Sequence, residues 1–142
     1  MAPVIEPVTT MQRMPAETAV VIIGGGIIGL TAALALSERN IPVVVLEKGR
    51  LAAEQSSRNL GWVRKTSRHV HDIPLAMAAD RLWAGMPERL GADVGYRQAG
   101  ILFVGREAGQ MALHEAWMQS VAGLDLDSRL LSRREIERLV PG

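Results

Sequence analysis

The chain has 142 residues, enough for one domain with a hydrophobic core. Hydrophobic residues make up 48% of it and charged residues 22%, a balance that excludes an intrinsically disordered chain. The net charge of +1 gives no reason to expect nucleic acid as a partner, and the absence of cysteine excludes disulfides, thiolate metal sites and cysteine catalysis, and fits a cytoplasmic location.

The first eighteen residues contain three prolines and no apolar core, so they do not resemble a secretory signal. We expect a flexible tail over residues 1–18. An uncharged run follows from Ala19 to Leu36 and is long enough for a membrane-spanning helix. The run lacks aromatic belts, and a second apolar run begins a few residues after it, so we expect no membrane span.

A strand, a glycine turn and a helix account for this run better. Residues 18–23 are β-branched and apolar on both faces, which is typical of a buried parallel strand. Gly24, Gly26 and Gly29 have the spacing of a dinucleotide-binding turn, in which they allow a tight turn, the approach of a pyrophosphate and close helix packing. A helix over 27–39 would then point its free N–H groups at the phosphates. The helix side chains that we expect to be buried are Ile28, Leu30, Ala33, Leu34 and Leu36.

A second apolar strand over residues 40–47 ends on Glu47. The number of residues between Gly29 and Glu47 is close to that expected for an acid that binds ribose hydroxyls. An acid at this position would repel the 2′-phosphate of NADP. These features together predict an α/β fold with a Rossmann-type βαβ unit. They leave FAD and NAD open as ligands, and a glycine turn without any ligand remains an alternative.

Residues 46–64, "LEKGRLAAEQSSRNLGWVR", resemble the corresponding stretch of the D-amino-acid oxidase superfamily of FAD-dependent oxidoreductases, which includes glycine oxidase and sarcosine oxidases. The likeness rests on Glu47-Lys48-Gly49 and on the Ser-Ser-Arg-Asn-Leu-Gly loop at 56–61. It continues through Arg64, the residues 72–76 and Leu82-Trp83. Residues 94–109 resemble the entry into the family's substrate domain, with a hairpin centred on residues 98–100.

The resemblance implies FAD as the cofactor. In the family the loop at 56–61 runs along the flavin and its diphosphate, where Ser56, Arg58 and Asn59 would donate hydrogen bonds and Gly61 would let the backbone approach the ring. A basic residue lies near the flavin at the position of Arg64. The cofactor-binding residues implied by fingerprint and resemblance are Gly24, Gly25, Gly26, Ile28, Gly29, Glu47, Lys48, Ser56, Arg58, Asn59, Gly61 and Arg64.

The resemblance also implies oxidation of the C–N bond of an amino acid or secondary amine by hydride transfer to the flavin. It implies a FAD-binding segment over 19–91 and an incomplete α+β substrate domain over 92–142. A fragment, a truncated gene and one piece of a split protein, with another polypeptide or a second copy as the partner, remain alternatives. No residue is a convincing catalytic acid or base, and we expect the chain alone to be inactive. A non-catalytic nucleotide-binding module and a fragment of an NAD-dependent dehydrogenase remain alternatives.

The remaining residues predict helices and no metal site. One helix should begin near Pro74, and Pro87 should end or kink it before Gly91. Another should cover residues 107–123, and a last one should begin at Ser132, which stands at capping-box spacing from Glu135. With three histidines and no cysteine, we expect no metal site, and His69 and His71 should be solvent-exposed loop residues. On the middle helix, Met111, Trp117, Met118 and Val121 are expected in the core and His114 at the surface.

Overall fold

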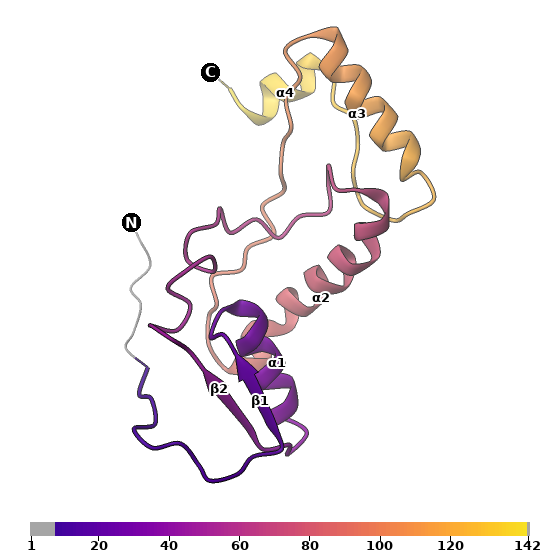
Figure 1. Ribbon diagram of the computed structural model, residues 1–142. Coiled ribbons are helices and arrows are strands. Elements are labelled where there is room, and N and C mark those ends of the chain that lie inside the picture. The colour runs from indigo at the N-terminus through magenta and orange to yellow at the C-terminus, as the bar shows by residue number, and fades with distance from the viewer. Residues whose placement is uncertain (1–7, 142) are drawn as a thin grey trace. The chain divides into compact units, whose positions relative to one another are not determined.

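A computed structural model describes residues 8–141, and the predicted tail lies outside the described residues over positions 1–7. The chain divides into two compact units, the first ending at Gly61 and the second beginning at Trp62 (Figure 1). The domain boundary predicted after Gly91 lies at the end of a helix within the second unit.

The first unit is built on a parallel pair of strands, β1 (Val20–Ile23) and β2 (Val43–Leu46), which are connected by helix α1 (Ile27–Ser37). Val20 pairs with Val43 and Ile23 pairs with Leu46. Parallel strands need such a crossover connection, and the β-branched residues suit a pleated sheet. The predicted βαβ unit is therefore present, although both strands are shorter than expected, and the run from Ala19 to Leu36 is divided between β1 and α1.

The predicted burial of Ile28 on α1 is wrong, because its side chain is 81% exposed. The helix contacts the sheet through Gly29, where an added Cβ would lie 3.1 Å from the Ile22 side chain. Nearly every residue of α1 is apolar, so the sequence has no polar face that could indicate its orientation. The other residues expected in the interface, namely Leu30, Ala33, Leu34 and Leu36, are half-buried.

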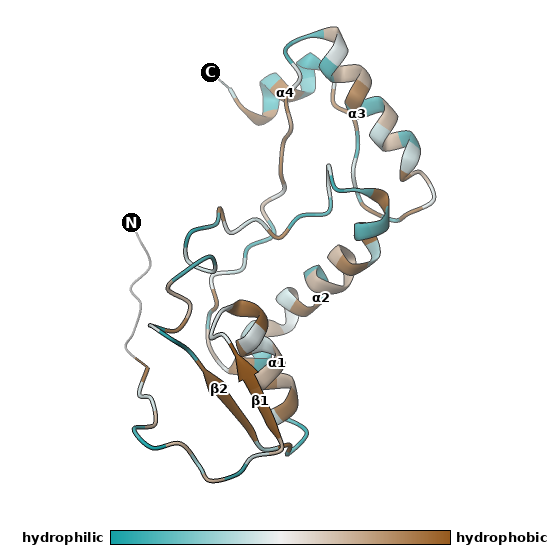
Figure 2. Ribbon diagram, in the orientation of Figure 1, coloured by the Kyte–Doolittle hydropathy of each residue, from teal (hydrophilic) through white to brown (hydrophobic). Residues whose placement is uncertain are grey.

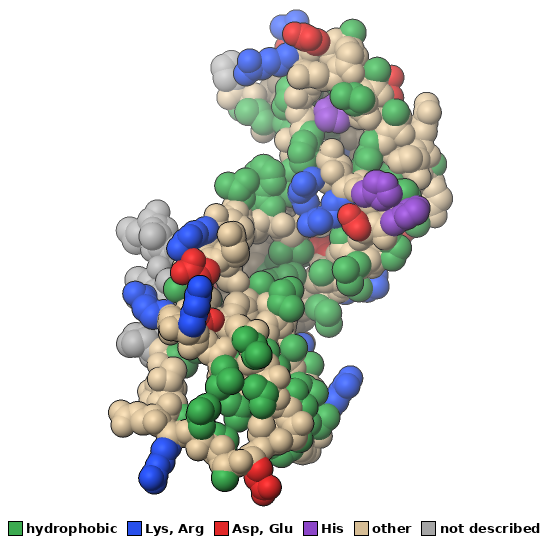
Figure 3. Space-filling view, viewed as in Figure 1, with side chains coloured by type: hydrophobic (Ala, Val, Ile, Leu, Met, Phe, Trp, Pro, Cys, Tyr) green, Lys and Arg blue, Asp and Glu red, His purple; other side chains and the backbone are tan. Residues whose placement is uncertain are grey.

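One face of the two-stranded sheet carries exposed apolar side chains. Val21 is 55% exposed and Ile23 is 88% exposed. A hollow of about 220 Å³ lies on this face between residues 14–18 and the strands. Figure 2 shows both strands as strongly hydrophobic, and Figure 3 shows hydrophobic side chains gathered on the surface of this unit. Within the described part of the chain, a helix thus covers one face of the sheet and not the other.

The second unit contains a short 3-10 helix η1 (Val70–Asp72) and the helices α2 (Ile73–Leu90), α3 (Ala108–Ser120) and α4 (Arg133–Leu139). Helix α2 begins beside Pro74 and ends before Gly91, as predicted, although it continues for three residues after Pro87. Pro87 stands in the last turn, where its missing N–H removes a single hydrogen bond of the helix. The helix ends at Gly91, whose φ of 64° is left-handed.

The core of the second unit is small. Ile73, Val121 and Leu126 are buried, and Trp117 is among the half-buried residues that pack against them. Of the residues predicted in the core, Val121, which directly follows α3, is buried, and Trp117 packs against the buried cluster. Met111 and Met118 are half-buried. His114 is also half-buried and not fully at the surface, because its ring lies against Phe103 with the ring centroids 6.5 Å apart.

The hairpin predicted around residues 98–100 is wrong for the described residues, since residues 92–107 contain no strand. A turn is present there: the Ala99 N–H donates to the Arg97 carbonyl over 3.0 Å, and Gly100 has a φ of 77°. A turn becomes a hairpin only when the flanking residues form a ladder of backbone hydrogen bonds. The α+β character predicted for this part is thus limited to helices and loops.

The capping box predicted at the last helix is confirmed. The Ser132 hydroxyl accepts from the Glu135 N–H over 3.4 Å, and the Glu135 carboxylate accepts from the Ser132 N–H over 2.8 Å. The Ser132 backbone and hydroxyl donors, together with Arg129, lower the pKa of Glu135 to about 2. Local chemistry at these two residues therefore determines where this helix begins.

Candidate nucleotide-binding site

The glycine turn between β1 and α1 has a geometry that only glycine tolerates at two of its positions. Gly24 has a φ of 107°, and its N–H donates to the Leu46 carbonyl over 2.8 Å, which ties the start of the turn to β2. At Gly29 an added Cβ would collide with the Gly24 carbonyl oxygen. The turn therefore brings the first residues of α1 against the end of β1, as the glycine spacing predicts.

Glu47 at the end of β2 faces this turn. Its carboxylate accepts from the Gly25 N–H over 2.7 Å and from the Gly49 N–H over 2.9 Å. These two bonds, the one from Gly25 first, lower the pKa of Glu47, so the group is ionised at neutral pH. Gly25 is buried, and a Cβ there would collide with the Leu51 side chain. A carboxylate has further acceptor positions, which remain chemically competent to bind hydroxyl groups.

Ser56 lies at the start of α1, although it comes 29 residues later than the residue it binds. Its hydroxyl oxygen accepts from the Ile27 N–H over 2.8 Å, and a Cβ added to Gly26 would lie 3.1 Å from the same oxygen. The Ser56 hydroxyl therefore satisfies one of the free N–H groups of the helix. A hydroxyl that accepts one hydrogen bond can donate its own hydrogen to another group, such as a phosphate oxygen.

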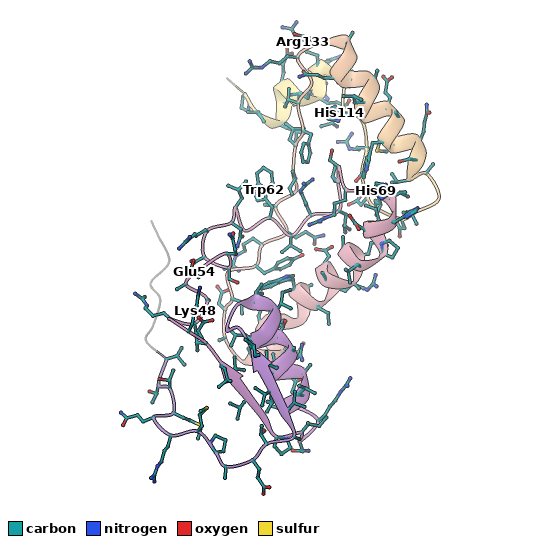
Figure 4. The ribbon with its side chains drawn as sticks, viewed as in Figure 1. Lys48, Glu54, Trp62, His69, His114 and Arg133 are labelled. Atoms are coloured by element: carbon teal, nitrogen blue, oxygen red, sulfur yellow. The ribbon has the colours of Figure 1, made fainter. Side chains whose placement is uncertain are left out.

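The other predicted residues of the first unit are exposed, and one of them, Asn59, shapes the loop at 56–61. The Asn59 side chain donates to the carbonyls of Gln55 and Ser56 and accepts from the Gly61 N–H over 2.6 Å. Arg58 forms an exposed ion pair with Glu54 over 2.8 Å. Lys48 is exposed, and Figure 4 shows Lys48 and Glu54 on the loop side of this unit. Ile28 is exposed on α1.

Arg64 belongs to the second unit, where it has its own surroundings. Its guanidinium donates to the Thr66 carbonyl over 2.7 Å and to the Ser67 carbonyl over 3.3 Å, and it lies 5.5 Å from the centre of the Phe103 ring. Trp62 contacts the same ring edge to face, with the ring centroids 6.5 Å apart. The cation is thus held by carbonyl groups and an aromatic face.

A polar cluster centred on Asp80 of α2 was not predicted from the sequence. The Asp80 carboxylate accepts from the Lys65 ammonium and from the Tyr96 hydroxyl, each over 2.7 Å. Asp80 stands seven residues after Ile73 and three after Met77. It therefore lies on the same side of α2 as these two core residues. An acidic residue on an otherwise apolar stripe is the signal that could have revealed it.

His69 and His71 are exposed, as predicted, although His71 lies in η1 and not in a loop; their rings lie 5.0 Å apart (His69 is labelled in Figure 4). Within residues 8–141, no group of three or more histidines and acids is placed to hold a metal ion. In the same range no helix has the length and apolarity that would be needed to cross a membrane.

Comparisons with known proteins agree with this geometry. A family model described as FAD dependent oxidoreductase (DAO) matches residues 19–142. One of the subunits of opine oxidase from Rhizobium meliloti is 30% identical over 138 residues, which cover 89% of this chain and 37% of that protein. The mitochondrial regulatory subunit of pyruvate dehydrogenase phosphatase from Mus musculus is 28% identical over 130 residues, covering 90% of this chain and 15% of that protein.

A solved structure of L-amino acid deaminase from Proteus myxofaciens, in complex with anthranilate, is also similar. It is 32% identical, its TM-score is 0.85, and the match covers 99% of this chain and 32% of that protein. The chain thus spans well under half of the length of each of these proteins. The family match covers all of both units except the first residues, and the chain belongs to the FAD-dependent oxidoreductase family DAO.

Proposed function

We propose that the chain is the FAD-binding N-terminal portion of an oxidoreductase that oxidises the C–N bond of an amino acid or a secondary amine. The observation that carries the proposal is the meeting of Glu47, Gly25 and Ser56 at one end of α1. An ionised acid beside a glycine turn and a hydroxyl at a helix N-terminus are the groups that the ribose and the diphosphate of a dinucleotide require.

The residues present fit the adenosine diphosphate half of FAD. The Glu47 carboxylate would accept from the ribose hydroxyls while it keeps its bond to Gly25. The Ser56 hydroxyl would donate to a phosphate oxygen, and the positive end of the α1 dipole would stabilise the negative charge of the diphosphate. The absence of a side chain at Gly26 leaves the helix start open to that group.

FAD, when bound, supplies the hydride acceptor for the oxidation of an amine to an imine. The part of this chain is to bind and orient the cofactor. In the second unit, the Arg64 guanidinium would provide positive charge for an anionic or carbonyl oxygen of the flavin, as the resemblance of its segment implies. The family membership and the names of the relatives, opine oxidase and L-amino acid deaminase, support an amino acid or amine as the substrate class.

The test is a titration of the 142-residue chain with FAD, followed by flavin fluorescence or calorimetry. We expect saturable binding of FAD and of ADP-ribose, which share the adenosine diphosphate half. The matched variant is Gly26→Val, which places a branched side chain where the diphosphate would lie, and we expect it to weaken the binding of both ligands at least tenfold, the equivalent of about 1.4 kcal/mol. Equal affinity of wild type and variant would contradict the proposal.

A second candidate is a nucleotide-binding module without catalysis. The similarity to a protein that is named as a regulatory subunit favours it. The complete protein distinguishes the two candidates: an oxidoreductase bleaches its bound flavin when an amino acid or amine is added without oxygen, whereas a binding module retains the oxidised spectrum. Either outcome is compatible with FAD bound at the glycine turn.

The opine oxidase relative is itself named as a subunit, which supports a completing polypeptide or a second copy as the partner of this chain.

A further inference from the structure

Asp80 joins three segments of the second unit. One carboxylate oxygen accepts from the Lys65 ammonium and the other from the Tyr96 hydroxyl, each over 2.7 Å. The side chains of Asp80 and Lys65 are only 18% and 25% exposed, so the ion pair is partly shielded from water. Hydrogen bonds to a carboxylate are among the strongest side-chain bonds in proteins.

Helix α2 provides a fixed base for these bonds. Asp80 lies one turn after Met77, which packs on the buried core of the unit. The Tyr96 ring also stacks on Trp83, one turn further along α2, with the ring centroids 6.5 Å apart and the rings nearly parallel at 12°. Tyr96 is therefore held at α2 by its hydroxyl and by its ring.

The loop that carries Arg64 and Lys65 has no comparable base of its own. Residues 61–65 contain neither helix nor strand, and the Arg64 guanidinium binds carbonyl groups of the same loop. The loop is attached elsewhere by side chains, as where the Trp117 indole N–H donates to the Arg68 carbonyl over 2.7 Å. Besides the contact of the Arg64 guanidinium with the Phe103 ring, the Lys65 bond to Asp80 is the attachment next to Arg64 in the chain.

We propose that Asp80 is a positioning residue, which holds the segment of Arg64 and Lys65, and the segment of Tyr96, on one turn of α2. The expected effect of Asp80 on FAD binding rests on the proposed function, because Asp80 would act on the cofactor through Arg64. Asp80 also compensates the positive charge of Lys65. Without this acid, a mostly buried ammonium would have to leave for water and would draw the loop away from α2.

The central variant is Asp80→Asn, which keeps the shape of the side chain and removes its charge. The matched control is Asp93→Asn, since Asp93 also forms an ion pair within this unit, with Arg97, but through exposed side chains. The conservative variant Tyr96→Phe removes one of the two bonds and retains the stacked ring. It provides an independent measurement if Asp80→Asn reduces the yield of folded protein.

Two readouts do not depend on the cofactor. The chain has a single tyrosine, so the ultraviolet absorbance of phenolate reports Tyr96 alone. The bond to Asp80 raises the pKa of Tyr96, while Lys65, Tyr96 and Arg81 lower the pKa of Asp80. In Asp80→Asn we therefore expect Tyr96 to ionise nearer to the ordinary value of about 10. We also expect faster amide hydrogen exchange over residues 62–69 and unchanged exchange in α3, with neither change in Asp93→Asn.

The third readout is the affinity for FAD, which we expect to fall roughly three- to tenfold in Asp80→Asn and to stay unchanged in Asp93→Asn. Unchanged Tyr96 ionisation and unchanged exchange in Asp80→Asn would overturn the attachment itself. If both change but the FAD affinity equals that of Asp93→Asn, the positioning role is overturned. If the wild-type chain binds no FAD, the proposed function fails, and Tyr96 ionisation and hydrogen exchange still decide whether Asp80 holds the two segments.

Discussion

At the scale of single residues, the charged carboxylate of Glu47 has two roles, one in the glycine turn and one in the proposed binding of the ribose. Its carboxylate holds the turn through the N–H groups of Gly25 and Gly49, and in the proposed function it also binds the ribose. Glutamine at this position would retain one acceptor oxygen, while alanine would retain none. The two variants therefore separate the shape of the turn from the binding of the ligand.

We predict that Glu47→Ala weakens the binding of FAD and ADP-ribose by roughly ten- to hundredfold and that Glu47→Gln has a smaller effect, because neutral hydrogen bonds are weaker than charge-assisted ones. Calorimetric titration of wild type, Glu47→Gln and Glu47→Ala checks that the affinity falls in this order. Riboflavin, which lacks the adenosine diphosphate half of FAD, is the control ligand and should bind wild type and both variants equally. Equal affinity of wild type and Glu47→Ala for ADP-ribose would remove Glu47 from the site.

The lowered pKa of Glu47 also gives a pH dependence. Because its pKa is lower in the folded chain than in the unfolded chain, ionised Glu47 stabilises the fold above the ordinary pKa of 4.5, and this contribution is lost as the pH falls through the folded value. The difference in thermal unfolding temperature between wild type and Glu47→Gln should thus shrink below pH 4.5. A difference that stays constant from neutral to acidic pH would show that the ionised form makes no special contribution.

At the scale of elements, the sequence predicted those features that depend on short spacings. The glycine turn, the apolar strand before Glu47 and the capping box of α4 each depend on residues a few positions apart, whose backbone requirements are local. Asp80 was not predicted, because its partners Lys65 and Tyr96 are brought to it only by the packing of two loops on α2. The hairpin and the burial of Ile28 failed for the same kind of reason, since both depend on the neighbours of a segment.

The capping box of α4 allows a test of this locality. We predict that Ser132→Ala costs about 1 kcal/mol of local helix stability and raises the pKa of Glu135 from about 2 toward its ordinary value, since one of its donors is removed. Nuclear magnetic resonance titration of Glu135 and hydrogen exchange over residues 133–139 measure both effects. Ser120→Ala, in the last turn of α3, is the control. A pKa of Glu135 that stays at about 2 would show that the hydroxyl is not a partner of the carboxylate.

At the scale of the whole molecule, the exposed apolar face of the sheet and the short match to each relative bear on activity. Val21 and Ile23 are exposed on a face of the sheet that no helix within residues 8–141 covers, and a pair of short strands has little stability of its own. The chain covers 32% of the L-amino acid deaminase and 37% of the opine oxidase relative. Exposed apolar surface of this kind favours association with another polypeptide or with a second copy.

We therefore predict that residues 1–142 alone, supplied with FAD, do not oxidise amines. Orientation of the reactants and exclusion of water each contribute several kcal/mol to catalysis, and a flavin bound only at an open turn would have neither. The measurement is the reduction of an artificial electron acceptor with D-amino acids, L-amino acids and N-methyl amino acids, with free FAD as the control. Turnover well above that of free FAD would refute the prediction. Activity that appears only on addition of a second polypeptide would instead identify that polypeptide as the partner. If the partner binds the exposed apolar face of the sheet, Ile23→Ser should weaken its binding to the chain without changing the affinity of the chain for ADP-ribose.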